Sequence, residues 1–206
     1  GRIAAQAPAS RKATVKLTAT STLPEVAAAV GAHLANRGIR AVLTGGACVA
    51  IHTGTYVSKD ADFVLQTAVS QRILDEALLQ LGFVREGAEY VHAEVPFWVE
   101  FPPGPLSIGD DLAIEPAELT VGRLKTLGLS ATDSCRDRLA AFFHWNDRQA
   151  LALAVKIAKA RRVDLDQIRR WSDHEGKSAE FGEFLKAATS GPRSDPGPGS
   201  ADNEPT

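Results

Sequence analysis

The stretch that most constrains this chain is residues 42–65, VLTGGACVAIHTGTYVSKDADFVL. It begins with an apolar run that ends at the glycine pair Gly45 and Gly46. It closes on two aspartates, Asp60 and Asp62, which alternate with apolar residues. In a strand, side chains two positions apart project from the same face. We therefore expect the two carboxylates to lie side by side, with the apolar residues between and after them turned into the core.

Two carboxylates aimed at one point repel each other unless a cation or a shared proton lies between them. Hard oxygen ligands of this kind suit Mg²⁺, and a glycine turn lets backbone N–H groups approach a phosphate. A third ligand is needed, and Glu100 is the best candidate because it is a lone acid in the apolar segment Phe97-Trp98-Val99-Glu100-Phe101. A buried carboxylate requires a cationic partner. The alternative is that Glu100 occupies the solvated face of an edge strand.

The surrounding sequence alternates helix and strand signals. Residues 22–25, TLPE, form a capping box that predicts a helix of roughly fifteen residues ending near Gly38. A short strand over 39–43, a short helix over 46–53 and a strand over 60–65 follow. An amphipathic helix closing at Gly82 then precedes strands at 83–85, 89–93 and 97–101, and residues 120–127 predict another strand or a crossing arm. The predicted class is α/β (α+β) with a mixed sheet and flanking helices.

From about Thr132 the pattern is helical. Thr132 or Asp133 is expected to cap one helix and Asp164 another, and residues 178–189 predict a last short helix. We predict a flexible arm over 1–20, a catalytic domain over 21–130, a helical subdomain over 131–190 and a disordered Pro/Gly/Ser tail over 191–206.

Composition narrows the class of protein. The chain has 206 residues, 44% of them hydrophobic and 23% charged, as in ordinary globular proteins. The net charge of -2 provides no global field for nucleic acid. No apolar run reaches the ~18 residues of a membrane span. Cys48 and Cys135 are expected to be buried free thiols in a reducing compartment, which favours a cytoplasmic location. The chain starts with Gly and contains no Met, so we expect the native start to be missing or processed.

The order of a strand, Gly45-Gly46, thirteen residues and then Asp60-Ala61-Asp62-Phe63 resembles the signature of the DNA polymerase β-like nucleotidyltransferase superfamily. Within it, the chain looks most like the small AbiEii-type nucleotidyltransferases, many of which are toxins of type IV toxin–antitoxin systems. The resemblance covers roughly residues 22–175. Each half of the motif alone is weak, whereas the ordered combination with a later strand acid is more specific.

The resemblance implies a role for each matching residue. Asp60 and Asp62 would hold two Mg²⁺ ions, or Mn²⁺ in their place, and Glu100 would bind the ion that faces the attacking group or accept its proton. Gly45 and Gly46 would let the backbone close on the triphosphate of an NTP. The reaction would be attack of an acceptor hydroxyl on the α-phosphorus, with release of pyrophosphate.

Further residues are candidates for the nucleotide. Ser58 matches a small hydroxyl residue often found near the aspartates, with an ordinary turn serine as the alternative. Family members often have Ser at the second glycine position, so phosphate contacts at Gly46 would depend on backbone N–H groups. In the helical part, Arg138 could pair with phosphate and Asp147 could steer a base or orient Arg148. The alternative for both is an intrahelical salt-bridge lattice.

The charge pattern of the helical part is compatible with several binding partners. Basic residues exceed acidic ones from Arg136 to Arg170, which would suit a tRNA or other RNA acceptor, a cognate antitoxin protein, or merely a solvated helix face. Two rival functions are an antibiotic-type transferase that modifies a small aminoglycoside-like molecule, for which Asp110-Asp111 is a faint hint, and a catalytically idle regulatory module. Lone His52 and His144 are expected to be structural histidines rather than metal ligands.

Overall fold

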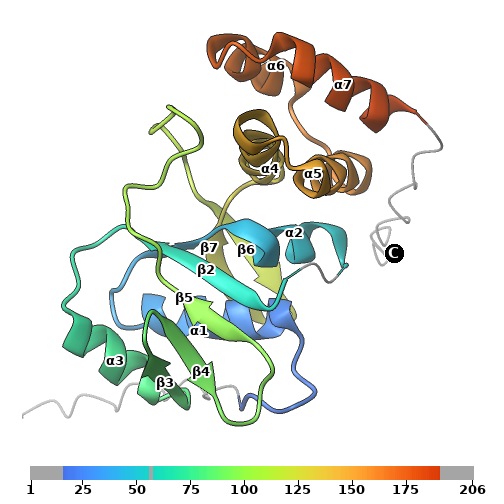
Figure 1. Ribbon diagram of the computed structural model, residues 1–206. Helices are drawn as coiled ribbons and strands as arrows, with labels where there is room; N and C mark the ends of the chain where they lie inside the picture. Colours follow the sequence, from blue (N-terminus) through green and yellow to red (C-terminus); the bar gives the residue numbers. More distant parts are fainter. Residues whose placement is uncertain (1–15, 56–57, 191–206) are drawn as a thin grey trace, which may run out of the picture.

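A computed structural model describes residues 16–55 and 58–190 (Figure 1). The predicted tail over 191–206 and most of the predicted arm over 1–20 lie outside the described residues. Along the part of the chain that is described, no helix is long and apolar enough to span a membrane.

Seven strands form one mixed sheet in the order β3-β4-β5-β2-β1-β7-β6. Two neighbouring pairs, β1 with β7 and β2 with β5, are parallel, and the other four pairs are antiparallel. This arrangement confirms the predicted α/β class with a mixed sheet. The strands are β1 (Ala41–Leu43), β2 (Asp60–Leu65), β3 (Phe83–Glu86), β4 (Glu89–His92), β5 (Trp98–Glu100), β6 (Ala117–Val121) and β7 (Leu124–Gly128).

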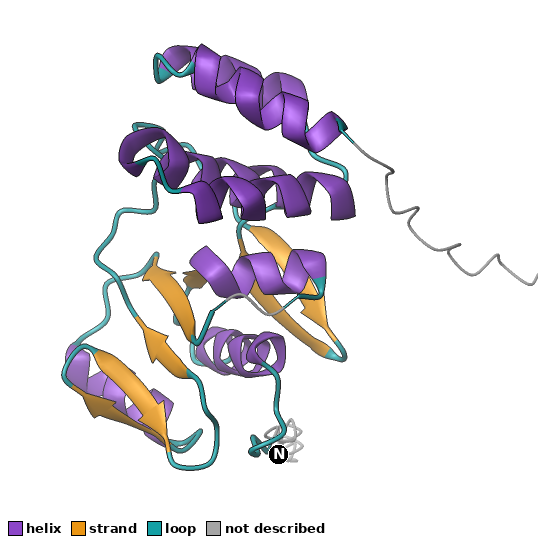
Figure 2. Cartoon of the chain, turned by 45° about the vertical axis from the view of Figure 1, so that its right-hand side comes forward, coloured by secondary structure: helices purple, strands orange, loops and turns teal. Residues whose placement is uncertain are grey.

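The helices are stacked in layers on this sheet. Figures 1 and 2 show α4 and α5 lying above α2, and α6 and α7 lying above α4 and α5. Helix α1 packs against β7, β1 and α2, whereas α3 packs against β3. The helices are α1 (Leu23–Ala35), α2 (Gly45–Thr53), α3 (Gln71–Leu79), α4 (Ala131–Trp145), α5 (Arg148–Ala160), α6 (Leu165–His174) and α7 (Ser178–Thr189).

Local signals in the sequence account for most element ends. The capping box at α1 is formed, because the Thr22 hydroxyl accepts from the Glu25 N–H and the Glu25 carboxylate accepts from the Thr22 N–H at 2.7 Å. Asp164 caps α6 as predicted, since its carboxylate accepts from the Gln167 N–H at 2.9 Å.

Two predicted elements were wrong in detail. Residues 120–127 do not form one strand or arm: they are the turn and inner parts of the β6–β7 hairpin, which reverses at Gly122 with φ +58°. A glycine in this left-handed conformation permits the tight reversal. The cap of α4 is Ser130, not Thr132 or Asp133, because the Ser130 hydroxyl accepts from the Asp133 N–H at 3.0 Å.

The core lies between the sheet and the helices. Ala61 and Phe63 on β2 are fully buried, which confirms that the apolar residues beside the two aspartates face the core. Val99 on the neighbouring strand β5 is fully buried as well. Cys48 and Cys135 are buried free thiols, as expected. Burial raises the pKa of the Cys48 thiol to about 12, so this side chain behaves as an inert apolar group.

Candidate active site

Strand register brings the three predicted acids together. Strands β2 and β5 are parallel neighbours, with Asp60 opposite Trp98 and Asp62 opposite Glu100. Residues that pair across two strands project from the same face of a sheet. Asp60, Asp62 and Glu100 therefore share one face, and all three are only half-buried, in contrast to the fully buried residues between them.

The glycine pair lies directly against this face. Gly45 begins α2 with φ +61°, a left-handed conformation that side chains rarely adopt, and a Cβ atom there would meet the Asp62 Oδ2 at 2.5 Å. The Thr44 N–H donates to the Asp62 backbone carbonyl at 2.9 Å, which fixes the start of α2 beside the carboxylate. The position thus requires glycine both for its backbone angle and for its contact with Asp62.

Gly46 allows a second close approach. A Cβ atom at this position would meet the Ser58 Cβ at 2.5 Å, so the loop before β2 packs onto the first turn of α2. Ser58 donates a hydrogen bond to the Asp60 Oδ1. The serine is therefore at the site, where it orients an acid; a contact with phosphate stays a prediction.

Glu100 has a partner that the sequence did not reveal. The Trp98 indole N–H donates to the Glu100 Oε1 at 2.8 Å. Trp98 is two residues before Glu100, and residues two apart on a strand share a face. This spacing in the sequence could have predicted the contact between the two side chains. This hydrogen bond holds one carboxylate oxygen in place and leaves the other oxygen available.

The electrostatics of Asp62 reflect the crowding of acids. The pKa of Asp62 is raised to about 6, first because burial disfavours its charged form and then because Asp60 and Glu100 repel it. Arg138 opposes this shift, and Asp137 adds to it. The site therefore has more negative than positive charge among its own side chains.

Arg138 lies near the acids but is not free. Its Nη2 and Nε atoms both donate to the neighbouring Asp137 carboxylate, at 2.7 and 3.1 Å. Its guanidinium nonetheless acts on the pKa of Asp62, which places this part of α4 within electrostatic range of the site. Arg136, two residues earlier on α4, belongs to a separate buried network with Asp111 and Asp133.

Asp147 has a structural role at the start of α5. Its carboxylate caps α5, accepting from the N–H groups of Gln149 and Ala150 at 2.9 and 3.0 Å. Arg148, which it was expected to orient, pairs with Glu183 and lies over the Phe142 ring. The structure does not bring Asp147 to the acids, and its predicted contact with a nucleotide stays untested.

The two lone histidines have structural partners, as expected. The Nε2 atom of His52 lies 2.9 Å from the Leu129 carbonyl, and burial lowers the pKa of this imidazole. The Nε2 atom of His144 lies 3.3 Å from the Glu175 Oε2.

No ready-made metal centre is formed in residues 16–55 and 58–190, because no three His, Cys, Asp or Glu side chains are grouped closely enough to hold an ion. The donor set nevertheless suits Mg²⁺, since three carboxylates on adjacent strands present only hard oxygen ligands. Repulsion keeps such carboxylates apart until a cation compensates it.

Comparison with solved structures supports the fold. The chain is similar to an antigenic nucleotidyltransferase-like protein from Paracoccidioides brasiliensis, with 16% identity, a TM-score of 0.54, and coverage of 82% of this chain and 94% of that one. A second match is the antibiotic-resistance factor ANT(2'')-Ia, at 13% identity, a TM-score of 0.45, and 76% and 94% coverage. No protein-family model and no curated protein matches the sequence. The first match shows that this chain shares the fold of a nucleotidyltransferase-like protein.

Proposed function

We propose that the chain is a Mg²⁺-dependent nucleotidyltransferase that moves an NMP from an NTP to an acceptor hydroxyl and releases pyrophosphate. One observation carries the proposal: the register that sets Asp62 beside Glu100, with the Gly45 backbone against the same carboxylate. The carboxylates, which would hold the cation, therefore lie beside the glycine turn and the first N–H groups of α2, which would bind the phosphate.

Each residue has a defined task in this proposal. Asp60 and Asp62 hold the metal, and Ser58 orients Asp60. The N–H groups at the start of α2 bind the phosphates of the NTP, because a helix N-terminus favours negative charge. Bound Mg²⁺, or Mn²⁺, supplies stabilisation of the entering and leaving oxygens in an in-line displacement.

Glu100 acts on the acceptor. As the acceptor oxygen forms its bond to the α-phosphorus, the bond to the β-phosphate oxygen breaks and pyrophosphate leaves. The acceptor proton passes to a carboxylate oxygen of Glu100. The Trp98 hydrogen bond to the Oε1 leaves the other oxygen for this transfer.

The acceptor class rests on the charge of the helical part. Lys156, Arg162 and Arg170 form no hydrogen bond or ion pair within the described chain, whereas Arg161 donates to the His52 carbonyl and Arg169 pairs with Asp166. Free cations on α5, on α6 and in the connection between them support an RNA acceptor, such as a tRNA. An AbiEii-like toxin with a cognate antitoxin is the biological setting that the sequence resemblance favours.

A transfer assay tests the proposal. The protein is incubated with each of the four α-³²P-labelled NTPs and Mg²⁺, in the presence of total RNA, total protein or an aminoglycoside. Label on RNA supports the RNA acceptor, and label on the aminoglycoside supports the antibiotic-type alternative. The Glu118→Gln variant is the matched control for Glu100→Gln, because Glu118 is an exposed carboxylate on the edge strand β6, which β7, β1 and β2 separate from β5. No label on any acceptor, with Asp60→Ala behaving as wild type, would indicate the idle module.

A further inference from the structure

A pocket of about 570 Å³ lies between α6 and the loop that joins β5 to β6. Ligand pockets for small molecules typically measure about 300–1,000 Å³. None of the residues assigned to the candidate active site lines this pocket. The pocket can therefore be tested separately from the acids and the glycine turn, and it shares only Arg170 with the cations named for the RNA acceptor.

The α6 side of the pocket is rich in hydrogen-bond donors. Gln167, Arg170 and His174 line it, at positions i, i+3 and i+7 of one helix face. Their side chains form no hydrogen bond or ion pair with any other residue that the structure describes. Arg170 is exposed, so its guanidinium is available to a ligand.

Two buried donors in the pocket lining also lack partners. The Arg136 Nε and the Trp171 indole N–H are buried and have no hydrogen-bond partner in residues 16–55 and 58–190. Arg136 is only 2% exposed and Trp171 6%. Both atoms are enclosed by the protein, so a ligand in the pocket would meet the exposed donors of α6, Arg170 and His174, rather than these two groups.

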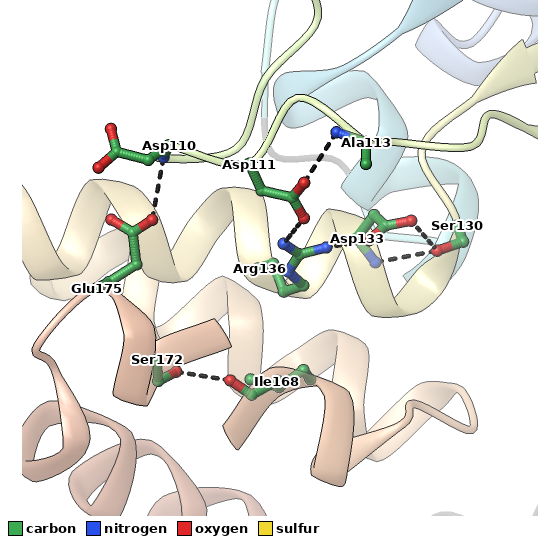
Figure 3. A network of polar contacts seen from close by, with 9 residues as sticks. All are labelled: Asp110, Asp111, Ala113, Ser130, Asp133, Arg136, Ile168, Ser172 and Glu175. Carbon is green, nitrogen blue, oxygen red and sulfur yellow. Dashed lines mark hydrogen bonds and ion pairs between the residues drawn. The ribbon is translucent and has the colours of Figure 1, made fainter. Parts of the chain in front are cut away.

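The two aspartates that line the pocket leave its donors available to an anion. The Asp111 carboxylate is already held by Arg136 and by the Ala113 N–H, which donates at 2.8 Å. Arg136 also pairs with Asp133 at 2.9 Å. In Figure 3 the Asp110 carboxylate points away from α6, while its backbone N–H donates to the Glu175 Oε1 at 3.0 Å.

We propose that this pocket binds a small anionic molecule, through a phosphate or carboxylate group held by Arg170, His174 and Gln167. Guanidinium groups bind both anions through charge-assisted hydrogen bonds. The ligand would bridge α6 and residues 110–113. These residues belong to the loop between β5 and β6, which starts directly after Glu100. The site would thus connect the helical part to the segment that follows the candidate active site.

The three tryptophans permit a test that separates this site from the active site. The Trp171 side chain lines the pocket, the indole N–H of Trp98 donates to Glu100, and Trp145 is 77% exposed. Their ¹H–¹⁵N signals are assigned with single Trp→Phe variants. Inorganic phosphate and acetate are then titrated in turn at constant ionic strength, with chloride as the balancing ion.

We expect a saturable shift of the Trp171 signal at concentrations up to about 20 mM, with Trp145 unmoved. Arg170→Ala should weaken the apparent affinity by about tenfold or more, and His174→Ala should weaken it as well. Arg162→Ala removes an exposed cation outside the pocket and should bind as wild type. The anion that saturates at the lower concentration identifies the recognised group.

Two results would overturn the site. One is a Trp171 signal that neither anion moves. The other is an equal loss of affinity in Arg170→Ala and Arg162→Ala, which would indicate general attraction to positive charge. Mg²⁺ should shift Trp98 in the same spectra, so failure of the proposed transferase site and failure of this pocket are seen separately.

Discussion

Two groups of carboxylates in this chain lie in opposite electrostatic environments. Asp111 and Asp133 share the buried Arg136, and hydrogen bonds from this guanidinium lower the pKa of Asp111. Asp60, Asp62 and Glu100 have no such cation among them, and burial together with mutual repulsion raises the pKa of Asp62. The fold itself provides a cation for the first group, and we propose that a bound ligand provides it for the second. We infer that the first serves stability and the second serves function.

The largest expected effect is on activity at the second group. Asp62→Asn removes one metal ligand but keeps the shape of the side chain, so the transfer rate should fall by about 1,000-fold or more, equivalent to about 4 kcal/mol of transition-state stabilisation. The rate of labelled NMP transfer measures this. Glu118→Gln, at the far edge of the sheet, should retain the wild-type rate. An Asp62→Asn protein with more than a tenth of the wild-type rate would contradict the assignment.

Arg136→Met tests the first group. Removing the only Lys or Arg that is buried in the described residues leaves the Asp111 and Asp133 carboxylates without their partner, so the free energy of unfolding should fall by about 3 to 5 kcal/mol. Denaturant unfolding followed by circular dichroism measures the change.

Arg138→Met provides the comparison for that experiment. Arg138 pairs only with the adjacent, half-buried Asp137, so its loss should lower the free energy of unfolding by about 1 kcal/mol or less. Equal effects of the two substitutions would remove the distinction between the groups.

The pH dependence of stability distinguishes the groups by sign. The folded pKa of Asp62 is about 6, above its ordinary value of 3.8, so the folded state holds this proton more tightly than the unfolded state. The Asp62 carboxyl therefore destabilises the fold progressively as the pH rises from about 4 to about 6, and the penalty is complete above that range.

Asp62→Asn should remove this penalty. At pH 7.5 the variant should unfold with a free energy about 1 to 2 kcal/mol higher than wild type, after allowance for solvent screening of a half-buried group. At pH 4 the two proteins should be nearly equal. A variant that is less stable than wild type at pH 7.5 would show that Asp62 is compensated within the fold.

Asp147→Ala gives the smallest expected effect. Loss of the cap of α5 should lower the free energy of unfolding by about 1 kcal/mol, and the KM for NTP should change by less than about twofold. Asp147→Asn preserves a capping side chain and should restore stability. A large rise in KM in both variants would support the nucleotide contact that the sequence predicted.

The sequence predicted the common face of Asp60 and Asp62 because alternation along one strand is a local property. The spacing of Asp60 and Asp62 in one strand determines their common face, and the apolar residues around Glu100 indicate that it lies on a strand in the same sheet. The parallel pairing of β2 with β5 is a long-range property, so the opposition of Asp62 and Glu100 could only be confirmed by the structure.

The helical part was harder to predict, because helix faces carry polar residues for several reasons. Arg136 and Arg138 are two residues apart in sequence, yet one is buried in the network of Figure 3 and the other acts on the pKa of Asp62. Asp147 was predicted to serve a nucleotide, although a helix start explains an aspartate equally well. The contacts in the folded chain distinguish a cap, a buried ion pair and a residue near the acids.

The central claim is that the crowded acids require Mg²⁺, and the melting temperatures of wild type and Asp62→Asn test it most directly. In EDTA at pH 7.5 the variant should melt at the higher temperature. Adding Mg²⁺ should raise the melting temperature of wild type and leave the variant nearly unchanged, because the ion binds only where all carboxylates are present. If Mg²⁺ shifts both proteins equally, or neither, the acids of β2 and β5 are not a metal site.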